Sequence, residues 1–433
     1  MPCVLLLLLT LGALLAGCAH RPVSLGCDLP RYKLGVAAPT GGAETATTTP
    51  TYETVLRATL APRRGVTEAA ITSPSLLFLS GGSENGAFGA GLLDQWAAQS
   101  PGGRLPAFRV VTGVSTGALQ AITAFTGRTK ATIDGYTIDR ENELLQPLGG
   151  GLLGAVRKGS VATLGPLRTV TLPRLLDDTL LTDMANAGKP ASDGGAGRKL
   201  LVGVVNMNSG DAEIIDLTVL AQRWLAASGL SRAKAKSCLI EALVASSSVP
   251  LAAPPVFIDD VEYIDGGARF GVFYQASADA LQPVGGAESF ALPGTAYLIV
   301  NGTLAIDPYC PRVPAADGSC LSSGPLRNWD LLSLAQRSVG VLTNQVYRFS
   351  ADLVRRRADG QLLFQAALIE PAAQAFRFKP DDLPGEATEQ SCAAWRADDN
   401  RIDRPVQFHR RYMRCLIAYG RSRAVALGWG VTR

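Results

Sequence analysis

The pentapeptide GVSTG at residues 113–117 places Ser115 between a strand-like run and a helix-like segment, a position typical of a nucleophilic serine. It follows AFRVV, a run rich in β-branched residues, and precedes GALQAITAF, which has helical spacing. A sharp turn from strand to helix would expose the Ser115 hydroxyl, and Gly113 and Gly117 would let neighbouring backbone approach closely. Because a helix N-terminus favours negative charge, this placement predicts a nucleophilic Ser115, although the pentapeptide alone is more often a structural turn.

A serine hydroxyl needs a base to become a nucleophile, and the chain has only two histidines. His20 lies before a polar stretch rich in Gly and Pro, where it is poorly placed to reach a rigid site. His409 is followed by Arg410 and Arg411, whose charges would disfavour the imidazolium that a general base must become. The chain order Ser115, Asp, His409 is nevertheless that of α/β-hydrolases, so a His409-dependent triad stays open as an alternative.

Asp265 is the carboxylate with the most suggestive setting. It follows the β-type run VEYI and precedes Gly266 and Gly267, so a tight turn would hold it at a strand end, where open α/β sheets bind their ligands. Taken alone, Asp-Gly-Gly is more often an ordinary β-turn. Aspartate is a weak base with a pKa of about 3.9. Burial would raise this pKa and a hydrogen bond from Ser115 would align the proton transfer, so a Ser–Asp dyad is chemically workable.

The segment LSGGSENGAFGAG at residues 79–91 joins the apolar run SLLFL to a helix-like segment. Glycine-rich turns of this kind bind anions through backbone N–H groups, and the anion is either a nucleotide phosphate or a reaction oxyanion. The segment lacks the third glycine of a dinucleotide-binding fingerprint and the lysine of a P-loop. It therefore favours an oxyanion hole and no nucleotide.

Composition and patterning indicate an α/β protein. The chain has 433 residues, 47% of them hydrophobic, and its net charge of +4 gives no strong basic field for nucleic acid. Apolar runs at residues 75–79, 107–113, 199–207 and 296–300 alternate with segments of helical spacing. This alternation predicts a mostly parallel sheet covered on both faces. No cysteine or histidine spacing resembles a zinc site.

The N-terminus has the pattern of an export signal. The apolar run at residues 4–16 is too short to span a bilayer but fits the hydrophobic region of a signal peptide, although no Lys or Arg precedes it. The end of the run, Leu-Ala-Gly-Cys18, resembles a bacterial lipobox, in which the cysteine is acylated. We therefore expect an exported lipoprotein anchored through Cys18 in the bacterial envelope, at the outer membrane; a plain cleavable signal or a membrane anchor is the alternative.

Six further cysteines would be exported with the domain, and an even number in an exported chain suggests disulfides. Cys310 and Cys320 flank a loop rich in Pro, Gly and Asp and form the first expected pair, and Cys392 with Cys415 forms the second. Buried free thiols are the alternative.

We divide the chain into four parts: a signal with lipobox at 1–17, a tether and extension at 18–70, a catalytic domain at 71–305, and a helical extension packed on the core at 306–433. Within the last part, one apolar face predicts a long helix over residues 327–357 that packs on the core by that face. Its residues are Leu331, Leu334, Leu342, Val346, Phe349 and Leu353.

Four motifs together resemble a known family. LSGGSENGAFGAG, GVSTGAL, ASSSVP and YIDGG occur in this order and at similar separations in patatin-like phospholipases. The resemblance covers roughly residues 75–300, and four ordered motifs are far more specific than any one of them. The chain resembles a bacterial, lipobox-bearing member of this family.

The resemblance implies a three-layer α/β/α sandwich with a mainly parallel sheet. It makes Ser115 the nucleophile and Asp265 the base of a dyad without histidine, and it places the oxyanion hole at the backbone N–H groups around Gly81, Gly82 and Ser83. The implied reaction is hydrolysis of acyl esters in phospholipids, lysophospholipids or neutral lipids, with no metal and no cofactor.

The glycine-rich turn departs from the family pattern, Gly-Gly-Gly-x-Arg/Lys-Gly, at two positions. Ser83 replaces the third glycine and Asn85 replaces the basic residue, whereas the last glycine is kept as Gly86. On backbone grounds a serine keeps its N–H donor at this position only if its φ is negative. The departures leave the substrate open and allow a second interpretation, a catalytically silent lipoprotein that binds lipid or a partner on the same fold.

Overall fold

The computed structural model describes residues 24–34, 50–60, 75–149, 159–190, 193, 197–272, 295–302, 304, 310–312, 320–326, 328, 331–357, 363–381, 383 and 388–429. Its strands are β1 (Arg31–Lys33), β2 (Leu76–Leu79), β3 (Val110–Val114), β4 (Gln146–Pro147), β5 (Ala162–Thr163), β6 (Lys199–Asn206), β7 (Ala212–Asp216), β8 (Val256–Ile258), β9 (Val261–Asp265), β10 (Thr295–Val300), β11 (Leu363–Leu368), β12 (Arg377–Phe378) and β13 (Gln390–Ser391).

The α-helices are α2 (Tyr52–Leu60), α3 (Gly86–Gln99), α4 (Thr116–Thr126), α5 (Thr129–Tyr136), α7 (Leu172–Leu175), α8 (Asp178–Gly188), α9 (Leu217–Ala226), α10 (Gly229–Ser247), α12 (Leu331–Arg357), α13 (Ala372–Ala375), α14 (Cys392–Ile402) and α15 (Arg410–Leu427). Short turns of other helix types are η2 (Ser83–Asn85), η3 (Pro101–Gly103), η4 (Glu141–Glu143), η5 (Leu167–Thr171) and η7 (Gly266–Ala268).

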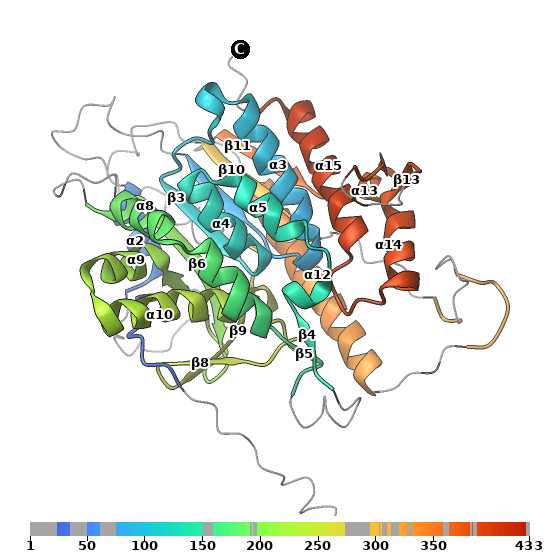
Figure 1. The fold of residues 1–433 in the computed structure, drawn as a ribbon, viewed down its shortest axis with the longest axis horizontal. Coiled ribbons are helices and arrows are strands. Elements are labelled where there is room, and N and C mark those ends of the chain that lie inside the picture. The colour runs from blue at the N-terminus through green and yellow to red at the C-terminus, as the bar shows by residue number, and fades with distance from the viewer. Residues whose placement is uncertain are drawn as a thin grey trace, which may run out of the picture.

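The central sheet follows the order β1-β7-β6-β3-β2-β10-β11, and β9 pairs with β6. The five strands from β6 to β11 run parallel, whereas β1, β7 and β9 are antiparallel to their neighbours. Figure 1 shows the helices arranged over this sheet. The predicted α/β class with a mainly parallel sheet is confirmed.

Both faces of the parallel strands are buried, as continuous apolar runs require. In β2, Leu77 and Leu79 join the larger core cluster with residues of α3, α4, α8, α9, α10 and α15, whereas Leu76 and Phe78 join a second cluster with α2. Successive side chains of a strand point to opposite faces. The alternation therefore gives the three-layer sandwich.

The segments outside the central part of the chain also build the fold. Strand β1, within the expected extension at 18–70, pairs with β7, and β11, within the expected helical extension at 306–433, pairs in parallel with β10. Helix α15 packs along α3. The boundary placed at residue 305 thus divides one sheet, because the strand that completes its edge lies about sixty residues further on.

The long helix is present as α12, but the expectation that its apolar face covers the core is wrong. Leu334, Leu342 and Phe349 are exposed, whereas Asn344 and Tyr347 are buried. The helix turns its polar face inward because that face borders a pocket rather than the hydrophobic core.

Three disulfides pair the six cysteines in the described part of the chain. Cys310–Cys320 and Cys392–Cys415, both predicted, are present. Cys27–Cys238, which the sequence left unpaired, links the N-terminal segment to α10 across a separation of 211 residues. Cross-links that close long loops restrict the unfolded chain most.

Among the described residues no helix combines the length and apolarity needed to cross a bilayer. The expected signal at 1–17, Cys18, His20 and the expected domain start at Ile71 lie outside the described residues.

Candidate active site

Ser115 occupies the turn between β3 and α4. Its backbone has φ 55° and ψ −126°, an uncommon conformation for a residue with a side chain, and the residue is 6% exposed. A Cβ at Gly117 would come within 2.5 Å of the Leu79 and Ser80 carbonyl oxygens, and one at Gly113 would strike the Gly117 carbonyl. The two glycines of the pentapeptide are therefore needed for this sharp turn.

Ser246, from the ASSSVP motif on α10, holds the turn in place. The Ser115 N–H donates to Ser246 Oγ (3.1 Å), and that hydroxyl donates to the Gly203 carbonyl of β6 (2.7 Å). The ASSSVP motif is part of the resemblance, but nothing in the local sequence marks Ser246 as a site residue. Its role follows from contacts across 131 residues of sequence.

Sheet register brings Asp265 next to Ser115. On β6, Gly203 pairs with Val114, the residue before Ser115, and Val204 pairs with Asp265 at the end of β9. A Cβ at Gly266 would come within 2.6 Å of the Gly203 carbonyl, so glycine at this position lets the turn after β9 lie against β6. Val114 and Asp265 therefore pair with adjacent residues of β6, which brings Ser115 and Asp265 close together.

Burial dominates the electrostatics of Asp265, which is 3% exposed. The Gly267 N–H donates to Oδ1 (2.6 Å), whereas Oδ2 is buried without a hydrogen-bond partner among the described residues. Burial raises the pKa of Asp265 to about 7 from 3.8, although Ser115 and the Gly267 N–H both act to lower it. No hydrogen bond of ordinary geometry joins Ser115 to Asp265 here; such contacts often tighten only in a substrate complex.

The glycine-rich turn lies beside Ser115. Gly82 and Ser83 line a pocket with Ser115 and Asp265, and a Cβ at Gly81 would come within 3.1 Å of Ser115 Cβ. Gly82 has φ 152°, and a Cβ there would meet the Asn301 backbone at 2.7 Å. Gly86 opens α3 against Thr116 and Tyr136, where a Cβ would clash.

Ser83 contradicts the expectation that a serine here needs a negative φ. Its φ is 55°, so the serine adopts the left-handed conformation that a glycine would take, at a cost of about 1–2 kcal/mol. The turn thus keeps a glycine-like backbone. The Ser83 hydroxyl is buried without a hydrogen-bond partner in the described part of the chain.

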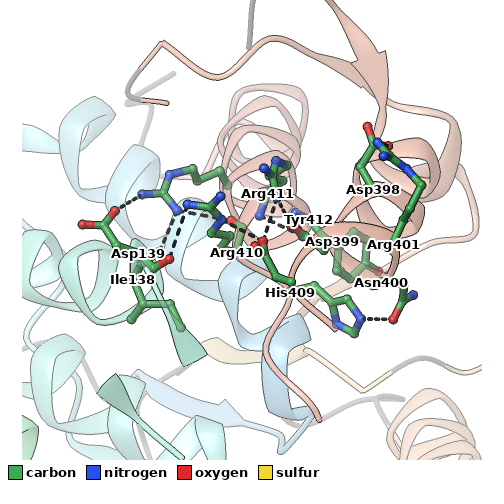
Figure 2. A network of polar contacts seen from close by, with 12 residues as sticks. Ile138, Asp139, Asp398, Asp399, Asn400, Arg401, His409, Arg410, Arg411 and Tyr412 are labelled. Atoms are coloured by element: carbon green, nitrogen blue, oxygen red, sulfur yellow. Dashed lines mark hydrogen bonds and ion pairs between the residues drawn. The ribbon is translucent and has the colours of Figure 1, made fainter. Parts of the chain in front are cut away.

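His409 is held away from the dyad. It is 6% exposed; Nδ1 lies 2.6 Å from Glu84 Oε2 and Nε2 lies 2.9 Å from Asn400 Oδ1. Figure 2 shows the ring directed at Asn400, beside the Asp399–Arg411 pair. His409 is not among the described residues that line the pocket of Ser115 and Asp265. Its ring is used to bind Glu84, and the geometry does not support a His409-dependent triad.

Glu84 connects the C-terminal helices to the glycine-rich turn. It belongs to η2 and accepts from the His409 N–H (3.0 Å), and its other oxygen pairs with Arg396 (3.2 Å). Asn85, where the family has a basic residue, accepts from the Tyr412 hydroxyl (3.2 Å). Helices α14 and α15 therefore fix the turn that follows β2.

We expect His409→Gln to lower the unfolding temperature and to reduce kcat for ester hydrolysis by only about tenfold. The change weakens a buried contact to Glu84, worth about 1–3 kcal/mol, and leaves the dyad in place. Thermal unfolding and ester kinetics measure the two effects. A loss near 10⁴-fold with an unchanged unfolding temperature would instead make His409 the base.

Two cavities meet at Ser115. One, of about 330 Å³, has a mainly apolar lining that includes Leu119 of α4, Leu172 of α7 and Leu164. The other, of about 480 Å³, contains Asp265 and is bordered by α12. An apolar cavity next to a serine hydroxyl suits a substrate with a long hydrocarbon part.

The chain is similar to known proteins in part of its sequence and, weakly, in structure. A family model described as patatin-like phospholipase matches residues 77–275. No curated protein matched the sequence. Among solved structures, the crystal structure of VipD from Legionella pneumophila is similar at 12% identity and a TM-score of 0.29, covering 82% of this chain and 69% of that chain. The matched residues contain Ser115, Asp265 and the glycine-rich turn, and this part of the chain matches the patatin-like phospholipase family.

Proposed function

We propose that this protein hydrolyses acyl esters of lipids with Ser115 as nucleophile and Asp265 as base. The family supports lipid acyl hydrolysis in general. The observation that supports the dyad is the register on β6, which sets a strained serine turn beside a buried carboxylate. The raised pKa of Asp265 suits a general base that works near neutral pH.

The reaction proceeds in two steps. Asp265 accepts the proton of Ser115 while Oγ attacks the ester carbonyl, and the N–H groups of Gly82 and Ser83 stabilise the oxyanion. Collapse of this intermediate breaks the ester bond, and Asp265 returns its proton to the leaving alcohol. A water molecule then loses its proton to Asp265 and attacks the acyl-enzyme. The fatty acid leaves as Ser115 regains a proton.

An active-site probe and an ester assay test this function together. A serine-reactive fluorophosphonate is expected to label the wild-type protein, which also hydrolyses p-nitrophenyl esters. A wild type that is folded but neither labelled nor active would support the catalytically silent, lipid-binding alternative. Ser83 and Asn85 are the departures that motivate that alternative.

The leucine-lined cavity is proposed to hold the acyl chain. Leu119 lies one turn beyond Ser115 on α4 and lines this cavity. We expect Leu119→Trp to lower kcat/KM for laurate esters by about tenfold or more and to leave butyrate esters nearly unaffected, because only the longer chain needs the filled space. The measurement is a chain-length series with Leu230→Trp, at an exposed position, as the control. An equal loss for all chain lengths would place the acyl chain elsewhere.

We further propose that the protein is exported and held at the envelope membrane by an acylated Cys18. The support is the lipobox-like end of the N-terminal apolar run. Cys18→Ser is expected to move the protein from the membrane fraction to the soluble fraction without changing its esterase activity. Retention of the variant on membranes would contradict the anchor.

A further inference from the structure

Tyr347 reaches the catalytic pocket from a part of the chain outside the family match. It lies on α12 (orange in Figure 1), is 7% exposed, and lines the same pocket as Ser115 and Asp265. The family match ends at residue 275, so this side chain belongs to none of the four motifs.

Glycines from separate segments make room for the Tyr347 side chain. A Cβ at Gly271 would come within 2.7 Å of the ring, and one at Gly302 within 2.9 Å. A Cβ at Gly267 would come within 3.2 Å of the hydroxyl, and one at Gly81 would collide with it. The phenol is therefore packed directly against backbone, which fixes its position closely.

The hydroxyl of Tyr347 borders both members of the dyad. A Cβ at Gly81 would collide with the hydroxyl and lie 3.1 Å from Ser115 Cβ, and a Cβ at Gly267 would lie 3.2 Å from the hydroxyl and 2.9 Å from Asp265 Oδ1. Among the described residues, the hydroxyl has no hydrogen-bond partner. Because Tyr347 lines the pocket, a ligand bound there could supply the missing contact.

The phenol is held in the form that can donate. Burial, and then the negative charge of Asp265, raise the pKa of Tyr347 above its ordinary value of 10. The side chain therefore keeps its proton over the range of pH in which Asp265 titrates.

We propose that the Tyr347 hydroxyl donates a hydrogen bond to the oxyanion formed at Ser115, beside the N–H groups of the glycine-rich turn. The proposal rests on the Ser115–Asp265 function. The phenol keeps its own proton throughout, so proton transfer still runs from Ser115 to Asp265 and then to the leaving alcohol. A donor from α12 adds positive potential in a pocket whose turn has Asn85 in place of a basic residue.

Tyr347→Phe tests the proposal because it removes only the hydroxyl. We expect kcat for p-nitrophenyl esters to fall by about 10²–10³-fold, the usual effect of losing one oxyanion donor, with KM changed only a few-fold. An alkyl trifluoromethyl ketone, which forms a tetrahedral oxyanion with a serine, should bind the variant more weakly by a similar factor. The unfolding temperature and the pKa seen in the pH–rate profile should not move. Tyr297→Phe removes a hydroxyl outside the described lining of either cavity and serves as the control.

Three results would overturn the proposal. Full kcat in Tyr347→Phe would give the phenol a packing role only. A loss accompanied by a shifted pKa in the pH–rate profile would mean that Tyr347 acts through Asp265. A loss of kcat with unchanged affinity for the ketone would mean that the Tyr347 hydroxyl does not bind the oxyanion. Ser115→Ala is measured in parallel: if that variant stays active, the dyad itself fails, whereas an inactive Ser115→Ala with a fully active Tyr347→Phe contradicts only the role of Tyr347.

Discussion

Replacement of Ser115 by alanine is expected to lower kcat for ester hydrolysis by about 10⁴-fold or more and to abolish labelling by a fluorophosphonate. The substitution removes the atom that would form the acyl-enzyme, and the loss of a serine nucleophile is among the largest effects seen for a single side chain. Folding should be nearly unchanged, because the Ser115 N–H that binds Ser246 belongs to the backbone. Unfolding temperatures, burst kinetics and labelling provide the measurement.

A matched variant controls for general effects of the substitution. Ser237, on the exposed side of α10, donates to the Ala233 carbonyl and lies outside the described lining of both cavities. Ser237→Ala should keep full activity and labelling. Turnover above one tenth of the wild-type rate in Ser115→Ala, with preserved folding, would mean that another residue is the nucleophile.

Asp265→Asn is expected to lower kcat by about 10⁴-fold and to remove the acid limb of the pH–rate profile. In the wild type, kcat/KM should rise about tenfold per pH unit below a pKa of about 7 and level off above it, because Asp265 must lose its proton to act as a base. A profile that levels off near pH 4 would contradict the raised pKa. Asp178→Asn, at an exposed position on α8, is the control.

Stability provides a second readout for Asp265. Its pKa is raised in the folded protein, so the folded state favours the protonated form, and the contribution of Asp265 to wild-type stability is greatest below the unfolded pKa of about 4. That stability is lost as the pH rises from about 4 to about 7, by up to about 4 kcal/mol for a shift of this size. The Asn variant cannot ionise. Its stability relative to the wild type should therefore increase with pH across this window, and parallel stability curves would contradict the linkage.

The sequence predicted those parts of the site that are marked by short local motifs. Ser115 and Asp265 each sit where a strand-like run meets glycine, and both signals can be read within about five residues. Their proximity required the resemblance, because nothing local states that Val114 and Asp265 pair with adjacent residues of β6. Long-range register is set by the packing of the whole sheet.

The residues that the sequence did not reveal act across long separations. Glu84 and His409 are 325 residues apart, and neither is marked by a motif that names its partner. Periodicity identified α12 as a helix but gave its orientation incorrectly. An apolar face predicts the buried side of a helix where the helix packs on a hydrophobic core, whereas α12 borders a pocket. Ser83 shows the opposite limit: its type argued against a left-handed backbone, and the surrounding fold imposed one.

The pairing order of the sheet also determines when during synthesis the active site can form. Strand β2 lies next to β10, which lies next to β11, so residues 76 and 368 belong to one continuous hydrogen-bonded ladder. The glycine-rich turn is then held by α14 and α15, near the end of the chain. Contacts this distant in sequence form only after the intervening residues have left the ribosome. The motifs that carry Ser115 and Asp265 are thus translated early, whereas the contacts that hold the glycine-rich turn beside them form only when α15 has been made.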